Sequence, residues 1–286
     1  MIDGHIHIKE KLVKISDFRK KLHCTGMAGA VILSLPPATF FTARQKYPFI
    51  QRLNNVLEWC RDEKDFYPFF WLDPLEEDAL KQIEVCCKQR ISGFKIICDR
   101  FLPSHATAME IFRCIAAKGK PILFHSGILW DGKVSSKYNH PLEFECLLEI
   151  PKLRFALAHV SWPWCDELIA LYGKFLNALA LNPQNSAEMF IDTTPGTPVI
   201  YRKEVLEKLY KVGYDLENNI MFGSDSYADD YNCQWVKEWV ARDKEILSGL
   251  GLSGEQIGKY FGGNVRRFLG IDKSVVEKKL PLAGLN

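Results

Sequence analysis

Short apolar runs recur along the chain, and longer segments with helically spaced apolar positions separate most of them. Eight of these runs are rich in β-branched and aromatic residues and are bounded by turn-forming or charged residues, which is typical of buried strands. The predicted strands cover residues 2–8, 29–35, 66–72, 93–98, 121–127, 154–160, 189–194 and 219–225. The pattern therefore predicts a fold built from repeated strand–helix units.

Helices are predicted where apolar residues recur every three or four positions between the strands. In the segment 52–63, for example, Leu53, Val56 and Cys60 lie on one helical face. The other predicted helices cover residues 104–119, 141–150, 163–180, 201–213, 231–247 and 253–271.

Eight strands that alternate with helices predict a parallel α/β fold, and the count of eight favours a closed (β/α)8 TIM barrel. An open doubly wound sheet is the main alternative. Its Gly-rich dinucleotide-binding turn should follow an early strand, but the G-x-G-x-x-G match, GLGLSG at 249–254, lies late in the chain between two predicted helices. No shift in composition and no linker divides the chain, so we expect a single domain over residues 1–286.

Composition and charge narrow the function classes. The chain is 47% hydrophobic and 25% charged, with a formal net charge of +2, so no electrostatic argument favours nucleic acid or an anionic membrane as a partner. No apolar run is long enough to span a membrane, and Asp3 interrupts any signal peptide, so the expected location is the cytoplasm. Nine cysteines without a C-x-x-C pair predict reduced thiols.

Ionisable residues lie at the ends of four predicted strands. His5 and His7 are two positions apart in the first strand, whereas His125, His159 and Asp225 end the fifth, sixth and eighth strands or lie close to their ends. In a barrel, the carboxyl ends of all strands meet on one face, where active sites lie. We therefore expect these five side chains to converge.

The period-two alternation of strand side chains predicts which of these residues point inward. His125 is in phase with Leu123, and His159 is in phase with Phe155 and Leu157. On this basis both histidines are predicted to face the barrel interior.

Alone, a histidine at a strand end is more often a hydrogen-bonded structural residue than a metal ligand, and H-x-H is a weak motif. Four of the seven histidines, however, occupy this one kind of position. Burying five unpaired polar groups together would be costly, whereas a divalent metal would satisfy them. Imidazole and carboxylate ligands suit Zn²⁺ best, with Mn²⁺ and Fe²⁺ as alternatives.

Several short motifs carry a resemblance to a known family. They are DGHIH at 3–7, LFHSG at 123–127, LAHVSWP at 157–163, MFGSDS at 221–226 and the closing IGKYFGGNVRRFLGI at 257–271. Together and in this order they resemble the amidohydrolase superfamily, in particular the branch that includes aminocarboxymuconate semialdehyde decarboxylase and related amidohydrolases. The resemblance spans nearly the whole chain.

The resemblance implies a metal site formed by His5, His7, His125 and Asp225, with His159 beside the metal-bound water or the substrate. A bound Zn²⁺ lowers the pKa of water to about 7. Asp225 would accept the proton of that water and deliver it to a leaving group, and His159 would polarise the scissile carbonyl. This branch often forms dimers, so the resemblance also allows a homodimer.

Two basic residues near the fourth strand are candidate substrate ligands. Lys95 lies on that strand, where some members of the superfamily carry a carboxylated lysine that bridges two metals. The alternatives are that Lys95 pairs with a substrate carboxylate or neutralises the acidic barrel mouth. Arg100 would bind a substrate carboxylate bidentately, with a solvated loop arginine as the alternative.

Aromatic and loop residues complete the set of candidates. Trp130 and Trp162 flank the histidines of strands five and six and are candidates for an apolar pocket wall, with ordinary loop packing as the alternative. Asp192 on the seventh strand is a candidate partner for a ligand histidine. The long connections 34–50 and 126–140 are candidate lids or pocket walls.

Three functions follow from these candidates. The first is a metal-dependent hydrolase that uses a metal-activated water on an amide, lactone or ester bond of a small molecule. The second is a metal-dependent, non-oxidative decarboxylase of a small carboxylated aromatic or muconate-like substrate, because one scaffold hosts both chemistries. The third is a barrel that binds ligands without catalysis.

Overall fold

The computed structural model describes residues 1–10, 14–40 and 45–271. The expected loop 34–50 falls partly on residues 41–44, and the expected single domain includes residues 272–286. Both of these segments lie outside the described residues.

The described residues form one parallel sheet of nine strands in the order β8-β7-β6-β5-β4-β3-β2-β1-β9. The strands are β1 (Ile2–His7), β2 (Gly29–Leu33), β3 (Phe66–Trp71), β4 (Gly93–Ile96), β5 (Ile122–Phe124), β6 (Arg154–Leu157), β7 (Glu188–Asp192), β8 (Ile220–Met221) and β9 (Ser226–Tyr227). From β1 to β8, each strand pairs in parallel with the next one along the chain.

The ring closes through the segment 220–227. Its first part, β8, pairs with β7, and its last part, β9, pairs with β1. Between the two parts, the amide of Gly4 donates to the carbonyl of Phe222 and the amide of Asp225 donates to the carbonyl of His5, both at 3.0 Å. One stretch of chain thus serves as the eighth strand of a TIM-type barrel, and the predicted fold class is confirmed.

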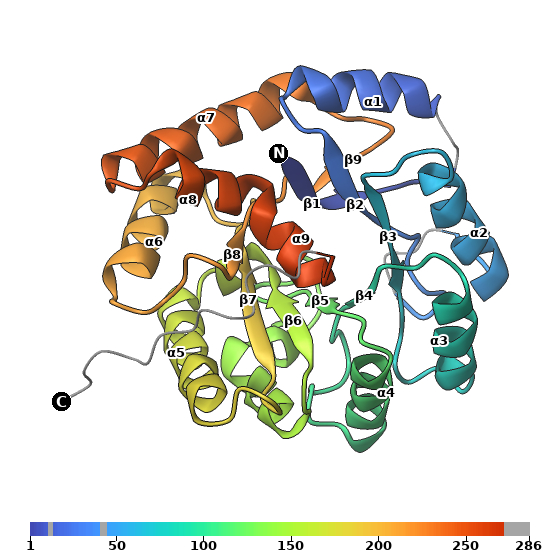
Figure 1. Cartoon of the computed structure of the whole chain (residues 1–286). Coiled ribbons are helices and arrows are strands. Elements are labelled where there is room, and N and C mark those ends of the chain that lie inside the picture. The colour runs from blue at the N-terminus through green and yellow to red at the C-terminus, as the bar shows by residue number, and fades with distance from the viewer. Residues whose placement is uncertain (11–13, 41–44, 272–286) are drawn as a thin grey trace.

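The helices surround the strands on the outside of the ring, except that the last of them lies across one end of the ring (Figure 1). They are α1 (Ile15–Cys24), α2 (Phe49–Cys60), α3 (Ala79–Lys88), α4 (Ala106–Ala117), α5 (Cys165–Leu181), α6 (Val199–Lys211), α7 (Cys233–Gly249), α8 (Gly254–Gly258) and α9 (Asn264–Leu269). The apolar pattern did not single out α1 and α3, and the predicted helix at 141–150 is a 3₁₀ segment, Pro141–Glu149. Within the described residues, no helix combines the length and apolarity that crossing a bilayer requires.

Two apolar layers hold the barrel. The outer layer lies between the strands and the helices, and the inner layer fills the interior with residues such as Val31, Phe69 and Phe190. Phe268 of α9 adds to the inner layer, with ring centroids 6.1 Å from Phe69 and 5.2 Å from Phe190. Because these side chains fill the inner part of the barrel, its polar side chains gather at the carboxyl ends of the strands.

Candidate active site at the carboxyl ends of the strands

A cavity of about 450 Å³ opens at the carboxyl ends of the strands. Its polar lining includes the five residues predicted to converge there, together with Lys95. Its other lining residues include the aromatic side chains Phe40, Trp130, Trp162 and Tyr227. The structure therefore brings the predicted histidines and Asp225 together in one place, although they are far apart in the sequence.

Strand β1 contributes His5 and His7 by alternation. Ile6 and Ile8 belong to the outer apolar layer, so the two histidines face the interior. A register shift between Asp3 and Ile6 marks a bulge that strict alternation does not predict. The bulge places the Asp3 carboxylate where it accepts hydrogen bonds from the backbone amides of His5 (3.2 Å) and Ser224 (2.8 Å).

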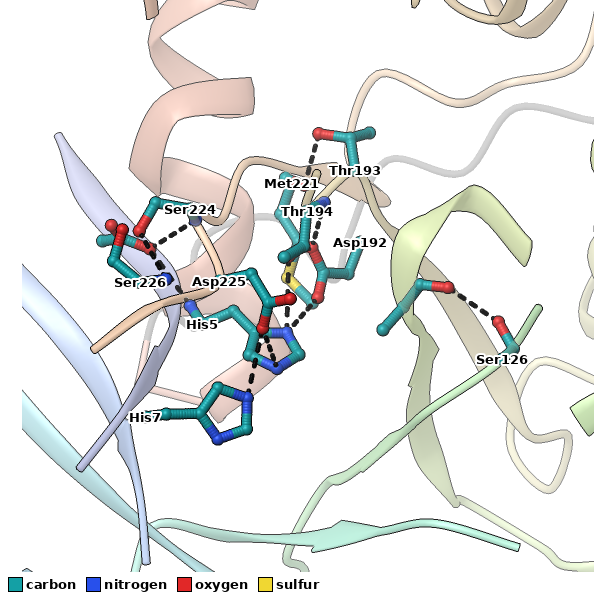
Figure 2. A network of polar contacts seen from close by, with 12 residues as sticks. His5, His7, Ser126, Asp192, Thr193, Thr194, Met221, Ser224, Asp225 and Ser226 are labelled. Carbon is teal, nitrogen blue, oxygen red and sulfur yellow. Dashed lines mark hydrogen bonds and ion pairs between the residues drawn. The ribbon is translucent and has the colours of Figure 1, made fainter. Parts of the chain in front are cut away.

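His5 is held by Asp192 at the end of β7. The His5 Nδ1 atom lies 2.8 Å from Asp192 Oδ2 (Figure 2). Because a carboxylate only accepts, Nδ1 carries the hydrogen and Nε2 keeps its lone pair. Burial, together with the nearby charge of Lys95, lowers the pKa of His5 to about 4. His5 is therefore a neutral imidazole oriented by a carboxylate, which is the state and arrangement of a typical metal ligand.

The Nε2 atom of His5 is buried and has no hydrogen-bond partner among the described residues. It faces Asp225 Oδ1 at 3.5 Å, and Asp225 Oδ1 also lies 3.1 Å from His7 Nε2. One ligand atom from each of His5, His7 and Asp225 lies within 4.8 Å of the others. Two imidazoles and one carboxylate in this arrangement fit a divalent ion such as Zn²⁺, which takes nitrogen and oxygen ligands at about 2.0–2.2 Å.

The electrostatics of Asp225 favour its ionised form. Burial alone would raise the pKa of Asp225, but the hydrogen bond from His7 and the neighbouring His5 and His159 lower it well below its usual range. The backbone of Asp225 has a φ of 57°, in the left-handed region. Such conformations persist where surrounding structure enforces them, and they are common at functional sites.

His125 lies in the same cavity but further from this cluster. Its ring centroid is 4.9 Å from that of His159, and its Nε2 is 3.3 Å from the carbonyl oxygen of Ile128. Burial, and then the neighbouring His159, lower the pKa of His125 well below its usual value, so its imidazole is neutral. Within the described residues, the compact three-residue group does not include His125. A role for His125 as fourth ligand stays a prediction.

His159 reaches the cavity by a route that the alternation argument missed. Phe155 and Leu157, the residues in phase with it, pack in the outer apolar layer. Strand β6 ends at Leu157, and His159, Val160 and Ser161 then adopt φ values of 61°, 48° and 52°. This left-handed turn reverses the direction of the side chain. The periodicity reason for an inward His159 was therefore wrong, although the residue does line the cavity.

Neighbouring residues support the turn at His159, and sequence reasoning did not identify them. Ser126 Oγ donates to the carbonyl of Ala158 and lies 2.7 Å from Ser161 Oγ. A Cβ at Gly196 would lie 2.9 Å from the Cβ of His159, so only glycine fits there without a shift. Ser126 and Ser161 lie beside the histidines in the LFHSG and LAHVSWP motifs, which was the available signal.

Lys95 is the inward-facing residue of β4. Its neighbours Phe94 and Ile96 pack in the outer layer, and Lys95 is 1% exposed. Its Nζ has no hydrogen-bond partner among the described residues. Burial lowers the pKa of Lys95 to about 8, against the opposing effect of Asp225 and Asp192.

The two candidate tryptophans line the cavity, whereas Arg100 does not. Arg100 is not among the cavity-lining residues, and its guanidinium pairs with Asp73 and Asp99. Trp130 and Trp162 do line the cavity, with nearly parallel rings whose centroids are 6.4 Å apart. The aromatic wall is therefore present, whereas the candidate arginine is engaged by carboxylates of the chain itself.

A closed α/β barrel with imidazoles and a carboxylate at the carboxyl ends of its strands defines the class of protein. The chain belongs to the amidohydrolase family, whose model matches residues 2–271. This membership supports an enzyme, and in general a metal-dependent hydrolase. A comparison with curated protein sequences finds no match.

Solved structures share this fold. A probable 2-pyrone-4,6-dicarboxylic acid hydrolase from Acinetobacter baumannii, with citric acid bound, is 11% identical with a TM-score of 0.62, covering 94% of this chain and 98% of that chain. An amidohydrolase from Burkholderia multivorans with bound HEPES is 12% identical with a TM-score of 0.64 and the same coverage. Dihydroorotase from Campylobacter jejuni is 16% identical with a TM-score of 0.57, covering 96% of this chain and 84% of that chain.

Proposed function

We propose that the protein is a metal-dependent hydrolase that cleaves an amide, lactone or ester bond of a small molecule. One observation carries this proposal. The neutral imidazole of His5 has a buried, unpaired Nε2 that faces His7 and Asp225 in an open cavity of about 450 Å³. A buried polar atom without a partner costs free energy, and a bound metal would remove this cost.

His5, His7 and Asp225 would hold the ion, with His125 as the proposed fourth ligand from the same cavity. Zn²⁺ fits this donor set, with Mn²⁺ and Fe²⁺ as alternatives. When bound, such an ion acts as a Lewis acid and lowers the pKa of water from 15.7 to about 7.

Two side chains of the protein would transfer the proton of the attacking water and polarise the scissile carbonyl of the substrate. Asp225 is held ionised by its imidazole neighbours, so it can take a proton from the attacking water and pass it to the leaving group. His159 has a buried Nδ1 without a partner among the described residues. Its ring lies 5.6 Å from that of His5, a position from which it can polarise the scissile carbonyl.

The size of the cavity supports a small substrate, because typical ligand pockets measure about 300–1,000 Å³. The aromatic side chains Trp130, Trp162 and Phe40 give it an apolar wall. The structural relatives named above include a probable hydrolase of a cyclic dicarboxylic acid and a dihydroorotase. Their names support cyclic amides and lactones as the first compounds to screen.

A decarboxylase is the second candidate, because the sequence resembles the branch that contains one. The specific observation in its favour is the buried, unpaired ammonium of Lys95 in the cavity, where a substrate carboxylate would be attracted. Release of CO₂ identifies this reaction, whereas hydrolysis of a lactone or ester yields a new carboxylate and an alcohol.

Metal analysis of the purified protein, followed by a substrate screen, tests the proposal. We expect about one divalent ion per chain, loss of activity with a chelator, and recovery on adding Zn²⁺ or Mn²⁺. The double variant His5→Ala/His7→Ala should lose both the ion and the activity while remaining folded. Metal content that is substoichiometric and unchanged by this double variant would overturn the proposal, as would activity that survives complete metal removal.

A further inference from the structure

Lys95 lies across the barrel from the imidazole–carboxylate cluster. Three strand pairings separate β4 from β1, so the cavity lies between Lys95 on one wall and His5 and His7 on the other. A ligand in the cavity would contact both walls. The position suits a group that anchors one end of a substrate while the other end meets the cluster.

The ammonium of Lys95 has no anion of its own. Other buried cations of the chain are paired: Arg202, for example, binds Asp243, and Arg52 donates to the carbonyl of Trp71. Lys95 Nζ, by contrast, is buried without a hydrogen-bond partner among the described residues. A buried ammonium is normally paired, because leaving it unpaired is costly in free energy. An anionic ligand would remove this cost.

The charges around the cavity also favour an anion. Asp225 pairs with His7 and is a proposed ligand of the ion, and Asp192 accepts hydrogen bonds from His5 and from the backbone amide of Thr194. With a divalent ion in place, the positive charges of the ion and Lys95 outnumber these two carboxylates. A negatively charged substrate would balance the site, whereas a neutral one would not.

The apolar and aromatic side chains that line the cavity would contact the rest of the ligand. Ile97, Ile128 and Leu129 are apolar, and Trp130 stacks on Trp162 with an interplanar angle of 16°. Flat aromatic faces favour a planar ligand. A carboxylate directed to Lys95 would thus leave a flat, apolar body against these side chains.

We propose that Lys95 is a specificity-determining residue that binds a carboxylate of the substrate, so that the enzyme acts on small, planar, carboxylate-bearing amides, lactones or esters. This inference rests on the proposed hydrolase and names its substrate class. It differs from a carboxylated Lys95 that bridges two metal ions, because a bridging role requires a second ion and removes the positive charge.

Binding of benzoate, with benzamide as its neutral counterpart, tests this recognition without knowledge of the true substrate. Calorimetry is performed on the full chain, both metal-loaded and after chelation. In the chelated protein the ion no longer attracts anions, but Lys95 Nζ still has no partner, so we expect benzoate to bind more tightly than benzamide and more weakly than to the metal-loaded protein. Lys95→Met should weaken benzoate binding about 10- to 100-fold and leave benzamide binding unchanged, as expected for loss of a charge-assisted hydrogen bond. Lys95→Arg should retain part of the affinity.

Lys64→Met provides the matched control, because Lys64 lines a separate cavity. Phe66, the first residue of β3, also lines that cavity, which therefore lies at the amino ends of the strands, opposite the candidate site. Circular dichroism and thermal unfolding verify that each variant is folded. Equal benzoate affinity in the wild type and in a folded Lys95→Met variant would overturn the inference. Two ions per chain, one of them lost in Lys95→Met, would also overturn it in favour of the bridging role.

The same measurements separate this inference from the proposed function. If the protein holds no ion and hydrolyses nothing, yet benzoate binding depends on Lys95, the proposed function fails and carboxylate recognition stands. If the ion and hydrolysis are present and the charge of residue 95 has no effect on benzoate, the hydrolase stands and the specificity assignment fails.

Discussion

Two buried polar clusters meet at the carboxyl end of β7, and they differ in whether all of their buried polar atoms have hydrogen-bond partners. Behind the strand, Arg202 donates to Asp243 Oδ1 at 2.8 Å, to Asp243 Oδ2 at 2.6 Å and to the carbonyl of Thr193 at 2.5 Å. Tyr260 completes this support cluster by donating to Asp243 at 2.6 Å. None of the side-chain polar atoms of these four residues is left without a hydrogen-bond partner.

In front of the strand, the cavity cluster is incomplete. His5 Nε2, Lys95 Nζ and His159 Nδ1 are all buried without hydrogen-bond partners among the residues described. Two successive residues belong to different clusters. Asp192, the last residue of β7, hydrogen-bonds with His5 in the cavity cluster, and the carbonyl of Thr193 accepts from Arg202 in the support cluster. The difference supports a structural role for the support cluster and the proposed ligand site for the cavity cluster.

The largest effect on the cavity side is expected from Asp225→Asn. Loss of the carboxylate removes the proton acceptor and one proposed metal ligand, so kcat/KM should fall by about 10²- to 10⁴-fold. The midpoint of thermal unfolding of the metal-free protein should fall only slightly, because the His7–Asp225 pair is partly exposed and the asparagine oxygen can still accept the hydrogen bond from His7. Steady-state kinetics and calorimetry measure the two quantities. A large loss of stability with unchanged turnover would reverse the assignment of the two clusters.

Arg202→Met tests the support side. It leaves Asp243 buried without its cation, which should lower the free energy of unfolding by about 3–5 kcal/mol. The double variant Arg202→Met/Asp243→Leu removes both charges and should regain part of this loss. Urea denaturation measures both. If the single variant were as stable as the wild type, the pair would not have the structural role assigned here.

Asp192→Asn lies between the two clusters and should have a smaller effect. The amide holds the His5 ring less firmly than the carboxylate, so the affinity for the metal should fall about 10- to 100-fold. Competition with a chromophoric chelator measures this affinity. Asp65→Asn is the control, because Asp65 pairs with Arg266, away from the cavity. Equal metal affinities in both variants would show that Asp192 does not support His5 in this way.

Trp130→Ala should have the smallest effect. Trp130 is 78% exposed and stacks on Trp162 at the mouth of the cavity. We expect KM to rise about 2- to 10-fold, the value of one aromatic contact, with kcat and stability nearly unchanged. A large drop in kcat would instead place Trp130 at the reacting atoms.

The repeated patterns of the sequence predicted the fold and most of the cavity. Eight apolar runs identified the strands, and alternation within β1 oriented His5 and His7 because the chain there stays extended. Asp192 was also expected to contact a ligand histidine, and it lies 2.8 Å from His5. These features depend on local periodicity and on the known geometry of a barrel.

The features that were missed depend on contacts between distant segments. The left-handed turn that redirects His159 is supported by Ser126, 35 residues from its partner Ser161. The support cluster joins Arg202 to Asp243, 41 residues away. No local pattern of apolar and polar residues specifies such pairings, because tertiary packing overrides local preference at these positions.

Closure of the ring by the segment 220–227 links assembly of the site to the order in which the chain folds. His7 and Asp225 are 218 positions apart, so their contact is among the most non-local of the molecule. Contacts of this kind form late, because their loop entropy is recovered only after the intervening units have folded. The first strand therefore completes its pairing only when the segment 220–227 is in place, and a bound ion would stabilise the contact between them. Metal binding would then serve as a direct reporter of the final folding step.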